Sequence, residues 1–162
     1  MTTVTERAPA DAQAFAEWVR PHVSAMARLA ARLAPDADRD DVVQEALTRA
    51  WLNRDRYDAE RGAPSSWLLA ITADQARKAS WRRRPWPLAA GRASSVDLEG
   101  RFDLERALRR LTPRQRLAVD CFYFADLSVA DTAAVMRCTD GTVKSTLADA
   151  RAKLRAFLEV SA

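Results

Sequence analysis

The sequence predicts an all-α fold in which a flexible linker joins two small helical domains, although a length of 162 residues would also suit one domain. Glycine is scarce, with four residues, whereas alanine, leucine and arginine, which favour helices, dominate the composition. Apolar residues recur at intervals of three and four along most segments, as on one face of an α-helix. All five tryptophans lie before Pro87, which indicates that the two halves form separate cores.

The first domain is expected to span residues 1–86 and to contain three helices. The first covers residues 11–33, and the second runs from residue 40 to about residue 53 with Asp40 and Asp41 as its caps. After a polar stretch, Ser65 or Ser66 caps a third helix whose later turns are basic. Two prolines, at positions 85 and 87, end that helix because proline has no amide hydrogen to donate.

The linker is expected over residues 87–100, which lack an apolar period and contain proline, glycine and serine. The second domain then covers residues 101–162, with helices expected over 102–110, 113–125, 129–137 and 140–158. A turn of three residues separates the last two helices. A short helix, a tight turn and a longer helix are the layout of a helix-turn-helix, which places its second helix in the major groove of DNA.

Two start signals of one kind support these helices. Thr112 and Gln115 form the pattern of a capping box, with Pro113 at the first helical position, and Ser128 with Asp131 repeats the arrangement. The apolar residues predicted to form the core of this domain are Leu117, Phe122, Phe124, Ala133, Val135, Met136, Val143, Leu147, Ala150, Leu154 and Leu158.

Several classes of protein are not expected from this sequence. The apolar runs are far shorter than the roughly 20 residues that cross a bilayer, and the polar N-terminus does not resemble a secretion signal, so we expect a cytoplasmic protein without membrane insertion. Cys121 and Cys138 are expected to be unpaired. His22 is the single histidine and lies far from the cysteines in sequence, so no metal site is predicted. It lies on an apolar stripe and is expected to be a packed or half-exposed core histidine. We expect no cofactor and no enzymatic activity, because no activated nucleophile or glycine-rich phosphate loop is present.

Two charged segments of opposite sign suggest two different partners. Residues 36–45 contain five acids against one arginine, and residues 77–92 contain six basic residues and no acid. Trp81 and Trp86 bracket the sequence RRRP, a mixture suited to single-stranded nucleic acid because bases stack on rings while cations hold the backbone. Alternatively, Trp81 is buried, since it lies four helical turns after Trp67 on nearly the same face.

Four blocks, in order, resemble the extracytoplasmic-function (ECF) sigma factors, a family of bacterial transcription initiation factors. The blocks are DDVVQEALTRAW at 40–51, SSWLLAIT at 65–72, LTPRQRLAV at 111–119 and GTVKSTLADARAKL at 141–154. The resemblance covers almost the whole chain, including the position of the linker.

The resemblance implies a protein that binds core RNA polymerase, through the beta and beta-prime subunits, and promoter DNA. The implied polymerase-binding residues are Asp41, Gln44 and Glu45. The implied residues for the minus-10 element and its melting are Arg77, Lys78, Trp81, Arg82, Arg83 and Arg84. The implied residues for the minus-35 element are Thr142, Lys144, Ser145, Thr146 and Arg151. Many members are held by an anti-sigma factor, so the resemblance also allows for such a partner.

The chain departs from the family pattern in two places. Asp74 and Lys78 stand where the family usually has Asn and Asp, and they are interpreted as an internal ion pair at i, i+4. Thr146 and Asp149 stand where arginines are usual. We interpret Asp149 as the partner of a neighbouring cation, Arg151 or Lys153, with acceptance from a cytosine amino group as the alternative.

These departures leave two other functions open. One is a sigma-like adaptor that lacks promoter reading. The other is a helix-turn-helix transcriptional regulator, although such a protein would need a receiving domain, and the first half has no alternating strands and helices from which to build one.

Overall fold

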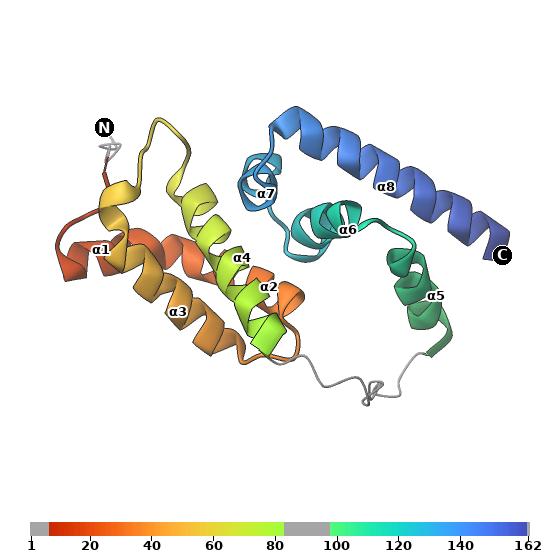
Figure 1. Cartoon of the computed structure of the whole chain (residues 1–162), viewed down its shortest axis with the longest axis horizontal. Helices are drawn as coiled ribbons and strands as arrows, with labels where there is room; N and C mark the ends of the chain where they lie inside the picture. Colours follow the sequence, from red (N-terminus) through yellow and green to blue (C-terminus); the bar gives the residue numbers. More distant parts are fainter. Residues whose placement is uncertain (1–6, 83–97, 162) are drawn as a thin grey trace.

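The computed structural model describes residues 7–82 and 98–161, and every regular element within them is helical (Figure 1). The N-terminal half contains α1 (Ala12–Val19), α2 (Val23–Leu33), α3 (Arg39–Leu52) and α4 (Pro64–Arg82). The C-terminal half contains α5 (Leu98–Arg109), α6 (Pro113–Val119), α7 (Val129–Met136) and α8 (Asp140–Ser161). The all-α prediction is confirmed. Most of the expected linker, together with Arg83, Arg84 and Trp86, lies outside the described residues.

The first predicted helix is in fact two helices. A 3-10 turn over Arg20–His22 separates α1 from α2. Pro21 lies in this turn and has no amide hydrogen for an α-helical bond, which accounts for the interruption. Asp11 caps α1, since its Oδ2 accepts from the amide of Ala14 at 3.0 Å.

The starts of α3 and α4 also differ from the prediction. The cap of α3 is Asp38, whose Oδ1 accepts from the amides of Asp40 at 2.9 Å and Asp41 at 3.2 Å. Helix α4 begins at Pro64, so Ser65 and Ser66 lie inside its first turn and are not caps. Their hydroxyls reach the other half of the chain, as described below.

The C-terminal half follows its start signals closely. The capping box of α6 is complete, with the Gln115 amide 3.2 Å from the Thr112 hydroxyl and the Gln115 side chain 3.1 Å from the Thr112 amide. At α7, the Ser128 hydroxyl accepts from the amide of Asp131. The Asp131 carboxylate does not complete a capping box with the Ser128 amide and accepts from Ser66 instead. The helix expected over 113–125 ends at Val119 and continues as a π-helical turn over Asp120–Phe124.

The buried apolar residues form two clusters, one of which crosses between the halves. The first is built on α2, α3 and α4, yet it includes Cys121, Ala125, Leu127 and Val135 of the C-terminal half. The second lies among α5, α6, α7 and α8. The prediction of separate cores is therefore wrong for the first cluster. Helices α2 and α4 present more apolar surface than α1 and α3 cover, and α7 with the π-helical turn buries the remainder.

Most of the predicted core residues of the second half are buried. Ala133, Val135, Met136, Val143, Leu147 and Ala150 are buried, while Leu117, Phe122 and Leu154 are half-buried. The prediction is wrong for Phe124 and Leu158, whose exposed fractions are 41% and 44%. Leu158 lies near the C-terminal end of α8, and Phe124 ends the π-helical turn; both line an open groove instead.

Candidate protein and nucleic-acid interfaces

An acidic surface lies on α3. Asp41 and Gln44 are exposed and Glu45 is half-buried, with its carboxylate 2.9 Å from Nε of Arg49. Asp41 and Glu45 line a hollow of about 150 Å³ between α3 and α4, whose far side includes Arg82. The structure thus brings one predicted promoter-binding cation beside two predicted polymerase-binding acids.

A cationic surface covers the last turns of α4. Arg77, Lys78, Trp81 and Arg82 are all exposed, and 70% of Trp81 is accessible. The alternative in which Trp81 is buried beside Trp67 is therefore wrong. The buried face of α4 ends near Ala76, so Trp81 lies past the helices that cover it. A hollow of about 560 Å³ is lined by Asp74, Arg77, Lys78, Trp81, Arg82 and Arg137.

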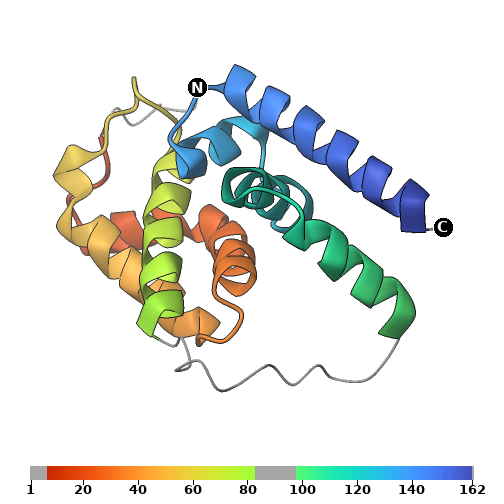
Figure 2. The same cartoon turned by 45° about the vertical axis from the view of Figure 1, so that its right-hand side comes forward.

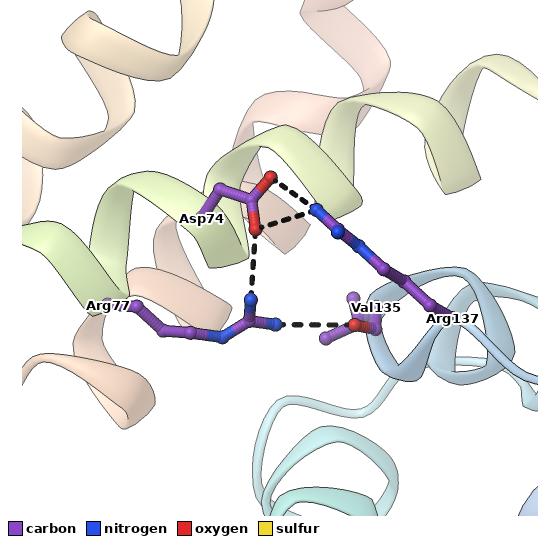
Figure 3. Close-up of polar contacts among 4 residues, drawn as sticks. All are labelled: Asp74, Arg77, Val135 and Arg137. Atoms are coloured by element: carbon purple, nitrogen blue, oxygen red, sulfur yellow. Dashed lines mark hydrogen bonds and ion pairs between the residues drawn. The ribbon is translucent and has the colours of Figure 1, made fainter.

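Asp74 joins the two halves of the chain (Figure 3). Its carboxylate accepts from Nη1 of Arg77 at 2.9 Å and from Nη2 of Arg137 at 3.0 and 3.2 Å. Arg77 also donates to the carbonyl oxygen of Val135 at 3.3 Å. The interpretation of Asp74 and Lys78 as an ion pair is wrong, because the tertiary packing of α7 against α4 supplies Arg137 as the partner.

The second helix of the helix-turn-helix presents a polar face to solvent. Val143, Leu147 and Ala150 bury one side of α8. On the outer side Lys144, Ser145 and Arg151 are exposed, while Thr142 and Thr146 are half-buried. The Thr139 hydroxyl accepts from the amide of Thr142 at 3.2 Å, and the Ser145 hydroxyl donates to the Thr142 carbonyl at 3.0 Å. Four of the predicted minus-35 residues, from Thr142 to Thr146, therefore share the N-terminal end of α8, whereas Arg151 lies in the middle of the helix.

Asp149 does not have the predicted partner. In the part of the chain that the structure describes, no ion pair joins this exposed carboxylate to Arg151 or Lys153. Arg151 donates instead to the hydroxyl of Tyr123 at 3.0 Å. The favoured interpretation of Asp149 is wrong, and the alternative, a contact with a base, remains a prediction.

An apolar groove between α5 and α8 was not expected from the sequence. Its volume is about 650 Å³, and apolar side chains make up most of its surface. Residues lining it include Leu104, Tyr123, Phe124, Leu154 and Leu158. One sequence signal could have revealed it: the apolar stripe of α8 is longer than the short helices α6 and α7 are able to cover.

The titratable groups outside these surfaces are shifted mainly by burial. Desolvation lowers the pKa of the half-buried His22, against the opposing effect of the Asp131 carboxylate. Burial, reinforced by Asp120 and opposed by Arg77, raises the pKa of the Cys121 thiol to about 12. Both cysteines are free.

Within residues 7–82 and 98–161, no group of acidic, histidine or cysteine side chains could hold a metal ion. No helix in these residues is long and apolar enough to span a membrane.

Comparisons with known proteins agree with this arrangement. The family description "Sigma-70 region 2" matches residues 18–86, and "Sigma-70, region 4" matches residues 101–154. The ECF RNA polymerase sigma factor SigM of Mycobacterium tuberculosis is 36% identical over 161 residues, covering 91% of this chain and 79% of its own. The RNA polymerase sigma-E factor of Streptomyces avermitilis is 35% identical over 156 residues, covering 90% and 85%.

Two solved structures resemble the whole chain. CnrH in complex with the cytosolic domain of CnrY matches with a TM-score of 0.65 and 28% identity, over 94% of this chain and 92% of CnrH. The sigma factor RpoE of Bartonella quintana, in complex with the anti-sigma factor NepR, matches with a TM-score of 0.59 and 26% identity, over 91% and 98%. The order of the helices, the helix-turn-helix and these relatives together establish that the chain belongs to the ECF sigma factors, which direct transcription initiation.

Proposed function

We propose that this sigma factor binds core RNA polymerase through the acidic surface of α3 and holds a promoter with α4 and α8. Residues 1–86 would capture polymerase and hold the melted minus-10 element, and residues 101–162 would bind the minus-35 element. The observation that carries the proposal is that acidic, cationic and polar surfaces of suitable chemistry lie on three separate helices.

The polymerase contact is argued from charge and exposure. Asp41, Gln44 and Glu45 lie at i, i+3 and i+4 of α3, so one partner surface can contact all three. Asp41 also lies in the first turn, where the helix dipole favours an anion. A basic patch on the beta or beta-prime subunit would complement this surface.

The minus-35 contact is argued from the N-terminal end of α8. In a helix-turn-helix, the first residues of the second helix contact base edges, and phosphate contacts fix the register. Lys144, Ser145 and Thr146 carry donors and acceptors of suitable length at this position, and Thr142 stands in the first turn. Arg151, two turns later, would contact a phosphate once its hydrogen bond to the Tyr123 hydroxyl is broken.

The minus-10 contact is argued from the cationic end of α4. Trp81 offers an exposed ring on which an unpaired base can stack, and Arg77, Lys78 and Arg82 supply cations for the backbone. Arg83 and Arg84 follow directly in the sequence and would extend this surface.

The test is transcription by purified core polymerase with and without this protein, on a library of genomic fragments, followed by sequencing of the transcripts. We expect start sites at a small set of positions that share two upstream elements. If the protein binds polymerase but yields no defined start site, it is an adaptor that does not read promoters. If it binds duplex DNA but not polymerase, it is a helix-turn-helix regulator.

Replacing Arg82, Arg83 and Arg84 with alanine should reduce promoter opening while leaving polymerase binding intact. Each lost phosphate contact lowers the salt slope of promoter binding by about 1, so the slope should fall by up to about 3. Permanganate reactivity of unpaired thymines, measured at several salt concentrations, gives the extent of promoter opening and its dependence on salt. The matched control replaces Arg106, Arg109 and Arg110, three arginines near the end of the described α5, and should leave both unchanged. If the triple variant lost polymerase binding as strongly as promoter opening, the assignment of the end of α4 to the minus-10 element would be wrong.

We also propose an anti-sigma factor as a partner. Both similar solved structures are complexes, and in one of them the sigma factor RpoE is bound to the anti-sigma factor NepR. The groove between α5 and α8 is the candidate site for such a partner on this chain. The groove is apolar with arginines at its edge, which suits an amphipathic helix that carries acids beside its apolar face.

A photo-crosslinking residue at Leu158, in the groove, should capture this partner in cells. The same residue at Val160, which is 88% exposed and does not line the groove, should not. The captured protein, once purified, should suppress transcription in the reconstituted system. A captured protein that leaves transcription unchanged would contradict the assignment.

A further inference from the structure

Helix α8 lies along the outer edge of the C-terminal half, and Figure 2 shows α5 and α6 on one side of it only, as does Figure 1. Val143, Leu147 and Ala150 turn toward the rest of this half and are buried. Because an α-helix turns by about 100° per residue, the positions farthest from this buried side follow from the sequence. They are Ser145, Ala148, Asp149 and Ala152, at i, i+3, i+4 and i+7, and all four are exposed. We call these four residues the outer stripe.

The outer stripe is made mainly of small side chains. Alanine and serine are short, so the backbone of α8 can approach the base edges closely along Ser145, Ala148 and Ala152. From the first to the last residue of the stripe the helix rises about 10 Å, which is the height of about three base pairs. Asp149 is its only charged member, and it projects furthest toward any bound base.

Cations border the outer stripe on both sides. Lys144, Arg151 and Arg155 are exposed and fall within about 40° of one another around the helix. Lys153 is exposed on the opposite border. Phosphates line both edges of the major groove, whereas the base edges form its floor. A helix with cations at its borders and small polar residues between them therefore fits a groove in which the outer stripe faces the bases.

Asp149 is an anion between these cations, yet it pairs with none of them. In the portion of the chain that the structure describes, its carboxylate has no ion pair and no hydrogen bond. Lys153 lies at i+4, the spacing that favours an ion pair, and Arg151 donates to Tyr123 instead. Phosphates repel an unpaired carboxylate, so Asp149 weakens the attraction to DNA of any sequence. A hydrogen bond from a base would offset this cost.

The chemistry of the base edges decides which base can supply that bond. A carboxylate only accepts hydrogen bonds. Guanine presents two acceptors in the major groove, and thymine presents an acceptor and a methyl group, so neither can donate to Asp149. Adenine presents a donor beside the N7 acceptor, which repels the second carboxylate oxygen. Cytosine presents its N4 amino group alone and is therefore the base that matches the carboxylate.

We propose that Asp149 is a specificity-determining residue that selects a cytosine in the minus-35 element. The inference rests on the proposed function, because it assigns a base preference to the surface that would bind this element. Asp149 acts in two ways: it accepts from the cytosine amino group, and it penalises every other base at that position by repulsion. The small side chains of Ala148 and Ala152 leave room for the base edge beside it.

The test uses holoenzyme reconstituted from core polymerase and the full-length chain. Its template is a promoter found by the transcript library, with a randomised minus-35 element and a barcode in the transcribed region. Sequencing of the transcripts gives the relative activity with each base at each position. For the wild type, we expect one position at which cytosine, on one of the two strands, exceeds each other base by roughly tenfold.

Two variants of Asp149 should change this preference in different ways. Asp149→Asn should move it from cytosine to adenine, because an amide both accepts from N6 and donates to N7 of adenine. Asp149→Ala should leave no preference at that position. The preferences at the other positions should stay the same in both variants. The matched control, Asp103→Asn, makes the same chemical change to an exposed carboxylate of α5 and should keep the wild-type preference throughout.

The salt dependence of promoter binding separates base reading from phosphate binding. Lys144→Ala removes a cation from the border of the stripe and should lower the salt slope by about 1. Asp149→Asn removes no phosphate contact and should not lower it. Thermal unfolding followed by circular dichroism checks that each variant is folded.

The outcomes distinguish this inference from the proposed function. Defined start sites with the same base preference in wild type and Asp149→Asn would overturn the inference alone. An equal gain in activity on every template would also overturn it, since Asp149 would then be a repulsive charge that reads no base. If the wild-type holoenzyme yields no defined start site, the proposed function fails, and the assignment of a cytosine fails with it.

Discussion

Truncating Leu29 to alanine is expected to lower the free energy of unfolding of the N-terminal half by about 3 kcal/mol, the largest stability effect that we predict. Leu29 lies on α2 with no exposed surface, and α2 packs against both α3 and α4. Removing its side chain forfeits buried apolar contact and leaves a cavity that three packed helices close only in part.

Urea titration followed by tryptophan fluorescence measures this effect, because all five tryptophans belong to the N-terminal half. The midpoint should fall while the slope stays constant. The control is Leu52→Ala at the end of α3, where the same chemical change is made to a leucine that is 65% exposed. It should change stability by less than about 0.5 kcal/mol. Similar shifts in the two variants would contradict the placement of α2 at the centre of the bundle.

Reversing two charges on α3, with Asp41→Lys and Glu45→Lys together, is expected to weaken binding of core polymerase about 100-fold. Truncating one partner of a buried interfacial charge pair costs about 2–5 kcal/mol, and a lysine in place of each acid adds repulsion from a basic partner. The fold should survive, because Glu45 loses only a partly exposed pair with Arg49.

Fluorescence anisotropy with labelled protein and purified core gives the two dissociation constants. The control variant, Glu17→Lys with Glu105→Lys, changes two exposed acids on α1 and α5 and alters the net charge by the same amount. It should bind within about threefold of wild type. Equal weakening by the two double variants would show that total charge, and not the surface of α3, attracts polymerase.

The order and kind of the elements followed from signals that act over a few residues. Thr112 and Gln115 satisfy amide groups within one helical turn, so the start of α6 was predictable from four residues. The stripe of Val143, Leu147 and Ala150 likewise specified which face of α8 is buried and which face is exposed to solvent. Even the interruption at Pro21, which we did not predict, has a local cause that the sequence contained.

The resemblance to the family located the candidate surfaces but not their surroundings. The exposure of Asp41 and Gln44 agrees with the amphipathic pattern of α3. The partners of Asp74 and Asp131 were not predictable, since Arg137 lies 63 residues from Asp74, and Ser65 lies 66 residues from Asp131. No local rule relates residues at such separations.

Thus the sequence alone determined that the chain is helical, where most helices begin, which face of each is apolar, and to which family the protein belongs. Only the tertiary structure decided that α7 docks on α4, that Cys121 is buried in a shared core, and that Phe124 and Leu158 border an open groove. The physical reason is range: capping bonds and helical periodicity act within about one or two turns. The choice among apolar faces depends instead on the total surface that the folded chain removes from water.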